Sequence, residues 1–259
     1  YIGLVEAGVG LTWLQGLLAL SLAASAGGSM VIVNTVVHVR TGLGGSNQDV
    51  AMLFAAYGLG SMSVAILMSR ILAAVSTRAT MIGGAVAMAC LLPVGGAGPG
   101  WIASIALWLL MGAASSAIGT PAGIVLRRSS SAADRPAVFA AQFALSHACW
   151  LVTYPLAGWL GATIGLDATF IVLAAVCSAA TLAAVRLWPA ADAVEIEHQH
   201  AAFDHDAMHV HDEHHRHAHE GWEGPEPHRH PHRHAPVRHS HPFTIDDHHF
   251  VWPRATERG

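Results

Sequence analysis

The chain changes character after Trp188. Residues 1–188 carry four acidic side chains, seven arginines and no lysine, and long stretches hold no ionisable group. Residues 189–259 carry the other thirteen acids, six arginines and seventeen of the nineteen histidines. The first part can dissolve in a bilayer, whereas the second cannot bury enough apolar surface to offset its chain entropy. We therefore expect a membrane domain over 14–188, a disordered His-rich cytoplasmic tail over 189–259 and a cytoplasmic linker remnant over 1–13.

Charge, cysteine content and motifs exclude several classes of protein. The formal net charge is −4 and no basic surface is apparent, so no nucleic acid partner is expected. The three cysteines fall inside apolar runs without metal-ligand spacing, which indicates neither a disulfide framework nor a cysteine metal site. No His-Glu-x-x-His or Gly-x-Ser-x-Gly motif occurs, and residues 211–215 have the wrong order for the first. We expect no enzyme and no required cofactor.

Runs of about twenty apolar residues, the length that crosses a bilayer, occur six times in the first part. Alanine, glycine and small hydroxyl residues fill them, as expected where membrane helices pack closely together. The sequence therefore predicts an all-α membrane protein with six transmembrane helices. The predicted spans are Leu14–Val39, Val50–Leu72, Ala79–Val94, Trp101–Leu126, Ala137–Ile164 and Ala168–Trp188.

Arginine is concentrated at alternate connections between these spans, which lie on one side of the membrane. These arginines are Arg70, Arg78, Arg127, Arg128, Arg135 and Arg186. The opposite connections, 42–49, 95–100 and 165–167, have only Arg40 beside them. Because basic residues accumulate on the cytoplasmic side, we expect a protein of the cell inner membrane with both termini in the cytoplasm.

Three segments carry a family resemblance. Residues 68–81 (Met-Ser-Arg-Ile-Leu-Ala-Ala-Val-Ser-Thr-Arg-Ala-Thr-Met) form a basic second connection. Residues 119–129 (Gly-Thr-Pro-Ala-Gly-Ile-Val-Leu-Arg-Arg-Ser) end the fourth span, and residues 142–158 (Gln-Phe-Ala-Leu-Ser-His-Ala-Cys-Trp-Leu-Val-Thr-Tyr-Pro-Leu-Ala-Gly) form most of the fifth. They resemble the basic loop, the tenth-helix exit and the eleventh helix in the C-terminal half of a bacterial major facilitator superfamily transporter. The loop lacks the family's Gly and Asp before its first arginine.

The resemblance implies a fold and a type of activity. In that family each half has six helices, built from two inverted three-helix repeats, and the activity is secondary transport. Because Tyr1 is not an initiator methionine and no signal peptide precedes the first span, we expect an N-terminal six-helix half upstream. Some members, including nickel-resistance permeases, have a His-rich cytoplasmic tail, which the ending Phe243–His249 resembles. The substrate does not transfer with the fold.

His147 is the leading candidate for a site residue. It lies about ten residues into the fifth span, near the bilayer midplane at about 1.5 Å per residue. An ionisable residue there normally faces the bundle interior, and imidazole can load and release a proton near neutral pH. We expect it to bind substrate or protons, or else to be a structural histidine bonded to a neighbouring helix. Gln142, Trp150 and Tyr154 can share its face, although such an aromatic stripe is more often packing.

The first span contributes a second pair of candidates. Asn34 and His38 are four residues apart and share one helix face. Asn34 lies deep in an apolar run, whereas His38 is close to the outer end, where we expect it to meet headgroup water. Pro121 and Pro155 are each expected to free a carbonyl and kink a helix. No carboxylate lies inside the spans, so a proton-coupled carrier would use His147 or the upstream half.

Histidines in the tail repeat in His-x-His pairs. In an extended chain alternate side chains lie on one side, so two imidazoles can bind one ion. Neutral imidazole suits Ni, Co, Zn and Cu, and Asp204, Asp206, Asp212 and Glu213 can add oxygen ligands. The spacing lacks the closed geometry of a structural zinc site, so we expect several weak, exchangeable sites. The expected ligands are His198, His200, His209, His211, His214, His215, His217, His219, His228, His230, His232, His234, His239 and His241.

These features favour a secondary transporter, with efflux of a divalent transition metal such as nickel or cobalt as the leading function. One alternative is efflux of a small organic or drug-like compound, with the tail incidental. Another is a membrane-anchored metal sensor or store. Deletion of residues 191–259 separates them, because it abolishes a sensor but leaves a carrier with altered affinity.

Overall fold

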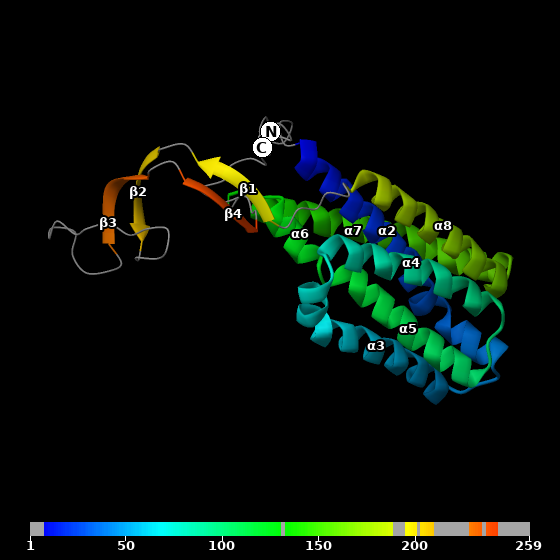
Figure 1. Ribbon diagram of the computed structural model, residues 1–259. Helices are drawn as coiled ribbons and strands as arrows, with labels where there is room; N and C mark the ends of the chain where they lie inside the picture. The colour runs from blue at the N-terminus through cyan, green and yellow to red at the C-terminus, as the bar shows by residue number, and fades with distance from the viewer. Residues whose placement is uncertain are drawn as a thin grey trace. The chain divides into compact units, whose positions relative to one another are not determined.

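The computed structural model describes residues 8–130, 133–188, 195–200, 203–209, 228–234 and 237–242. Its helices and its strands belong to two units, which are described separately. Six of the described helical segments are long and apolar enough to cross a membrane, and the membrane domain is all-α as predicted (Figure 1). The elements of this domain are α2 (Gly8–Val37), the π-helical turn η1 (His38–Gly42), α3 (Asn47–Ala74), α4 (Thr77–Gly96), α5 (Trp101–Gly119), α6 (Ala122–Arg128), α7 (Arg135–Thr163) and α8 (Leu166–Leu187).

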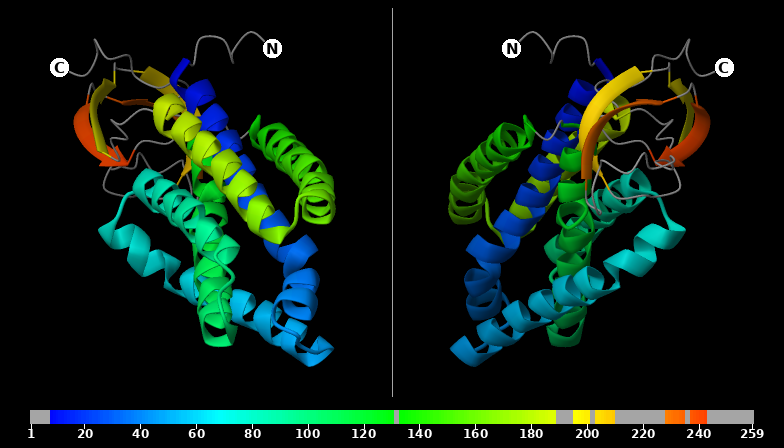
Figure 2. Two further views of the ribbon diagram at one scale, coloured as in Figure 1. Left: turned by 90° about the vertical axis from the view of Figure 1, so that its right-hand side faces the viewer. Right: turned by 90° about the vertical axis from the view of Figure 1, so that its left-hand side faces the viewer.

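Helix α2 is the central element of the bundle. It packs against α8 and α7 and, less extensively, against α4 and α5. Helix α3 lies at one edge, held mainly by α5, and α7 lies at another, held mainly by α2 (Figure 2). The buried side chains of α2 are therefore small or apolar, with Leu17, Leu20 and Met30 among the largest of them.

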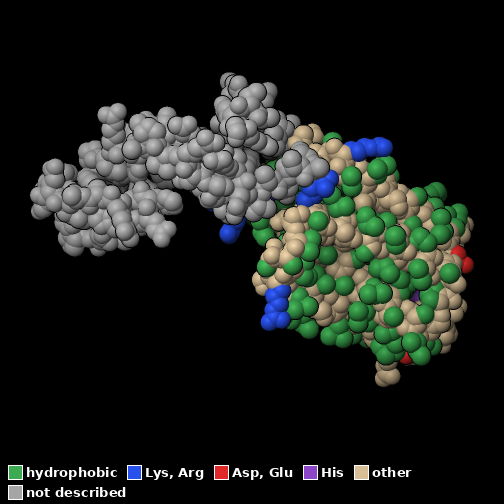
Figure 3. All heavy atoms as spheres, viewed as in Figure 1, with side chains coloured by type: hydrophobic (Ala, Val, Ile, Leu, Met, Phe, Trp, Pro, Cys, Tyr) green, Lys and Arg blue, Asp and Glu red, His purple; other side chains and the backbone are tan. Residues whose placement is uncertain are grey.

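The two ends of the bundle differ in chemistry. We call the end with the 42–49, 95–100 and 165–167 connections the glycine end, and the opposite one the arginine end. Basic side chains gather toward one end of the visible face and acidic ones toward the other (Figure 3). At the arginine end, Arg78 Nε donates to the Trp188 carbonyl at 3.2 Å and Arg78 Nη2 to that of Val185 at 3.2 Å. This arginine therefore caps the C-terminus of α8.

Local sequence explains where several helices begin. Ser46 and Asp49 form a capping box at the start of α3, with the Ser46 amide donating to Asp49 Oδ2 at 2.7 Å. Ser76 caps α4 by accepting from the Ala79 amide at 3.2 Å. Gly165 precedes α8 with a φ of +83°, a conformation that glycine adopts without a Cβ clash.

Helices α3 and α5 cross with their backbones in direct contact. A Cβ added to Gly60 would lie 1.8 Å from the Leu109 carbonyl oxygen, and one added to Gly112 would lie 1.9 Å from that of Tyr57. Only glycine fits at both positions, one on each helix. Small residues permit such close approach in membranes, and this crossing fixes Tyr57 beside α5.

Three details depart from or refine the predicted spans. Helix α2 begins at Gly8 rather than Leu14, inside the segment expected to be a linker. The fourth span is interrupted where expected, since α5 ends at Gly119 and α6 begins after Pro121. Pro155, by contrast, lies inside α7, which continues without interruption to Thr163.

The expectation of a wholly disordered tail is corrected at four short strands, described here apart from the helices. Strand β1 (Glu195–His200) pairs antiparallel with β4 (Val237–Pro242), and β2 (Phe203–His209) pairs antiparallel with β3 (His228–His234). Alternating His-x-His sequences suit the two-residue period of a strand, and pairing supplies hydrogen bonds to the backbone. The segment 243–249 lies outside the described residues.

Candidate functional site

Hydroxyl groups from three helices meet within the helical bundle. Tyr57 of α3 is hydrogen bonded to Ser115 of α5, and its hydroxyl interacts electrostatically with that of Tyr154 on α7. Tyr57 lies ten residues after Asn47 and Tyr154 nine residues before Thr163, so each is about 15 Å from the glycine end of its helix. That depth is about half of a 30 Å hydrocarbon layer. The two tyrosines therefore reach the same level from different helices.

Trp150 extends this cluster to α2. Its ring lies 5.0 Å from that of Tyr154 with an interplanar angle of 42°. A Cβ on Gly28 would lie 2.3 Å from Trp150 Cη2, so the indole occupies the space that this glycine leaves open. Trp150 and Tyr154 are thus packed together as the sequence suggested, and Tyr154 also faces the polar group on α3.

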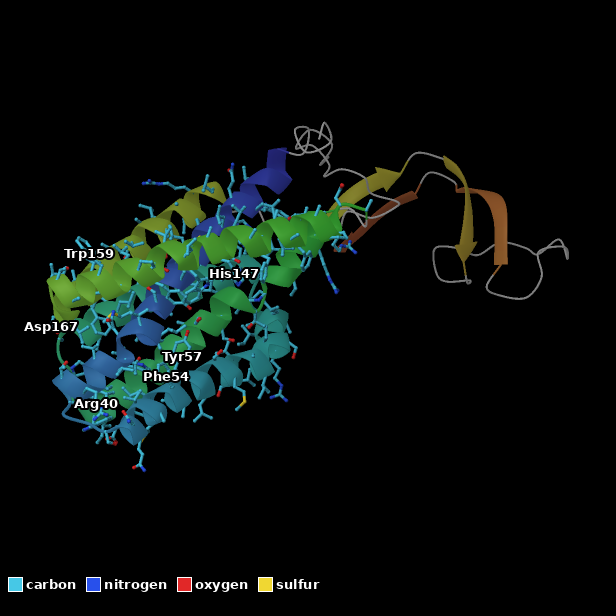
Figure 4. All side chains as sticks on the ribbon, turned by 180° about the vertical axis from the view of Figure 1, so that it is seen from behind. Arg40, Phe54, Tyr57, His147, Trp159 and Asp167 are labelled. Carbon is cyan, nitrogen blue, oxygen red and sulfur yellow. The ribbon has the colours of Figure 1, made fainter. Side chains whose placement is uncertain are left out.

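His147 does not face the bundle interior, contrary to expectation. Its side chain is exposed, and Nδ1 lies 2.8 Å from the Phe143 carbonyl oxygen of its own helix. A carbonyl only accepts, so Nδ1 carries the proton of the neutral ring and Nε2 carries the free lone pair. The ring also lies 3.9 Å from that of Phe143. Figure 4 shows His147 on α7 and Tyr57 on α3. The imidazole is thus oriented with an available acceptor nitrogen.

Asn34 and Gln142 join α2 to α7. Asn34 is buried and its Nδ2 donates to the Ala157 carbonyl at 3.0 Å. Gln142 Nε2 donates to Ser21 Oγ at 3.0 Å. Both amides are therefore engaged in contacts between helices and lie apart from His147. Among the predicted site residues, only Trp150 and Tyr154 are in direct ring contact with each other.

His38 is buried, in contrast to the prediction that it meets headgroup water. Its Nε2 lies 3.1 Å from Ser104 Oγ of α5, and its ring stacks on Trp108 at 4.9 Å. The prediction failed because α5 and α8 cover this end of α2, which a single-helix view cannot show.

The side chains that the structure describes include no group of three or more His, Cys, Asp or Glu residues able to hold a metal ion. The cysteines Cys90, Cys149 and Cys177 are free, as expected. In the tail, the strand register pairs His198 with His239 and His209 with His228. The remaining expected ligands of the segment 210–227, His211, His214, His215, His217 and His219, lie outside the described residues.

Sequence reasoning missed Tyr57 and Ser115. The chain has three tyrosines, two of them inside predicted spans, and a lone phenol in an apolar helix needs a hydrogen-bond partner. That requirement was the available signal for Tyr57. Ser115 is one of many small hydroxyl residues in the spans, and nothing in its spacing distinguishes it.

The family of the chain is shown by a comparison with known protein families. None of the curated proteins matches the chain. The model of the Major Facilitator Superfamily matches residues 17–239, which covers most of the sequence and all six membrane helices from the second turn of α2 onward. Members of that family are transporters, and the helical bundle described above agrees with a multi-pass membrane protein. The chain belongs to the major facilitator superfamily.

Proposed function

We propose that the chain carries a small solute across the membrane by passage between α2, α3, α5 and α7. The observation that supports this route is the Tyr57–Ser115–Tyr154 cluster, where hydroxyls of three helices meet at mid-depth. Polar groups are costly in an apolar layer unless they have partners, and a few convergent polar groups among aromatic rings are typical of small-molecule sites. Alternating access around this level would move the solute.

His147 is proposed as the exchangeable group of the carrier. The bond from Nδ1 to the Phe143 carbonyl leaves Nε2 free to accept a proton or to bind a metal ion. A second-sphere hydrogen bond of this kind orients metal-binding histidines in other proteins. No carboxylate lies within the spans except Asp49 and Asp167 in the first turns of α3 and α8, so His147 is the deepest titratable group other than tyrosine and cysteine.

We propose efflux of a divalent transition metal, such as nickel or cobalt, as the transport reaction. Imidazole nitrogen and tyrosine and serine oxygens are acceptable donors for such ions. The tail would capture the metal near the entrance: His228, His230, His232 and His234 alternate along β3 and share one face of its ladder by register. Bound metal would then exchange into the membrane domain.

Efflux of a small organic compound is the second candidate function. It is favoured by the neutral, aromatic character of the Tyr57–Trp150–Tyr154 group and by the lack of a metal-binding group of three among the described side chains. Aromatic walls with few polar groups suit an amphipathic organic solute. In that case the tail would be incidental.

The arginine end is proposed to face the cytoplasm of a cell with an inner membrane, because basic residues accumulate on that side. A further six-helix half is proposed to cover α7. Only 6% of its spanning stretch is buried, against 22% to 61% in the other five, and its hydropathy is the lowest of the six. A helix that is both the most exposed and the most polar fits contact with protein better than contact with lipid.

The test is export of Ni²⁺, Co²⁺ and Zn²⁺ from cells that express the full-length protein, compared with Tyr57→Phe and Tyr154→Phe variants. Each variant removes one hydroxyl and keeps the ring, so we expect reduced export at unchanged protein level. Trp159→Phe is the matched control, because Trp159 is 64% exposed near the end of α7. Absence of metal export in the unaltered protein would reject the metal, and export of an aromatic dye that depends on Tyr57 would then favour the organic substrate.

A further inference from the structure

At the glycine end, His38 lies where four helices meet. Its ring stacks on Trp108 of α5, with centroids 4.9 Å apart and an interplanar angle of 23°, and meets Phe170 of α8 edge-on at 6.3 Å. Trp108 Nε1 donates to Thr35 of α2 at 2.9 Å. Gly95 of α4 makes room for Phe170, since a Cβ there would lie 2.4 Å from its ring. One imidazole thus joins the contacts that hold this end together.

The hydrogen bonds around His38 define its tautomer. Ser104 Oγ donates its single proton to the Pro99 carbonyl at 3.1 Å, so it must accept from His38 Nε2 at 3.1 Å. The neutral ring therefore carries its proton on Nε2. Nδ1 has no hydrogen-bond partner among the described residues. A protonated ring would place a new donor at Nδ1 without an acceptor, in a buried and largely aromatic site.

The backbone at His38 is unusual in the same place. The turn His38–Gly42 is π-helical, and the Leu43 amide donates to the His38 carbonyl at 3.1 Å. Single π-helical turns occur mostly at functional sites, because they can revert to α-helix with a shift of register. A change in how His38 is held can therefore move the start of the 43–46 connection.

Few charged groups can stabilise a protonated His38. Asp167, at the start of α8, attracts it electrostatically. Arg40 of the same turn is bound to Asn47 Oδ1 at 2.6 Å, and Asp49 of α3 is bound to Ser46. The other titratable groups on the helices packed against it are Arg78 and Cys90 on α4 and Cys177 and Arg186 on α8, while α5 has none in residues 101–119. Asp167 is thus the acid through which an imidazolium would be stabilised.

We propose that His38 is a second proton-binding site, separate from His147, that holds the glycine end closed when neutral and releases it when protonated. The neutral ring satisfies Ser104 and packs between Trp108 and Phe170. The imidazolium is drawn toward Asp167 and water, which separates α2 from α5 and frees the π-helical turn. Acid on the glycine side would in this way favour opening on that side, whatever solute the carrier moves.

Cysteine labelling of the full chain in detergent tests the proposal. The three native cysteines are replaced by alanine, and Val39→Cys, at a fully buried position, reports opening. Its maleimide labelling rate is normalised to that of the exposed Gln48→Cys. With His38 present, we expect labelling at least about fivefold faster at about pH 5.5 than at about pH 7.5, on either side of the ordinary imidazole pKa of about 6.5. In a His38→Gln background, which keeps a donor for Ser104 but cannot titrate, the two normalised rates should be equal.

Equal rates at the two pH values with His38 present, or the same acid response in His38→Gln, would overturn the proposal. If His38→Gln fails to fold, Asp167→Asn replaces it, because that variant keeps the ring and its hydrogen bonds. The midpoint of the labelling response should then move to lower pH, since the carboxylate that stabilises the imidazolium is gone. An unmoved midpoint would contradict the assignment. No transported substrate is needed, so this result is independent of the proposed transport reaction.

Discussion

His147 offers the most direct test among single side chains. We expect His147→Ala to reduce metal export to background while protein level and melting temperature are retained, because its side chain bonds only within its own helix. His147→Gln should rescue little, since an amide can hydrogen bond but cannot titrate. Export assays beside detergent melting curves measure both quantities. Normal export by the alanine variant would remove His147 from the site.

Asn34 should behave in the opposite way, as a stabilising contact. Asn34→Leu keeps the volume but removes the bond from Nδ2 to the Ala157 carbonyl. We expect a loss of about 0.6 kcal/mol, and at most about 1.7 kcal/mol, as for other hydrogen bonds between membrane helices. Gln48→Leu, at an exposed amide, is the control and should leave the melting temperature unchanged. A large loss of transport without loss of stability would instead place Asn34 in the transport route.

The candidate site could be predicted only in part from single residues. The sequence indicated Trp150 and Tyr154, because aromatic residues at helical spacing share a face. It could not identify Ser115, whose importance comes from its position opposite Tyr57 on another helix. The burial of His38 was missed for the same reason, since Ser104 and the ring of Trp108 come from α5.

Among the helices, the α3–α5 crossing gives the sharpest prediction. Gly60→Ala and Gly112→Ala each add a methyl group within 2 Å of a carbonyl oxygen of the facing helix. The backbones must separate, so we expect destabilisation of about 1–3 kcal/mol and a displaced Tyr57. Gly58→Ala is the matched control on the same helix, because nothing lies within 4 Å of its Cβ position. It should be neutral, or stabilising by up to about 1 kcal/mol. Equal melting temperatures for the three variants would contradict this crossing.

The existence and order of the helices were predictable, whereas their irregularities were not. Runs without charge identified the six spans, because a bilayer imposes a minimum length, and Pro121 marked the break between α5 and α6. The π-helical turn at His38–Gly42 has no such signal. It depends on Ser104 and Trp108, which hold His38 from outside the helix. Pro155 remained inside α7 because a membrane helix tolerates one lost backbone bond.

For the molecule as a whole, the distribution of charge carries the most information. Arginine at one end and little ionisable side chain in between predicted the membrane domain and its orientation. The same composition gave no sign of the strand pairs in the tail, because their partners are separated by long stretches of sequence. Loop closure and register, not local preference, determine such pairing.

Removal of the tail separates the carrier from a metal sensor or store. We expect the full-length protein to bind several more Ni²⁺ ions than a chain ending at Trp188, at about pH 7 but not at about pH 5. Imidazole must be neutral to bind metal, and its ordinary pKa is about 6.5. Calorimetry on the two purified proteins measures this difference, and equal binding at both pH values would identify carboxylates as the ligands. Export should continue in the shortened protein at a higher half-saturating metal concentration, because the solute route lies between α2, α3, α5 and α7. A metal response that disappears altogether, with the helices still folded, would instead make the membrane domain an anchor for the tail.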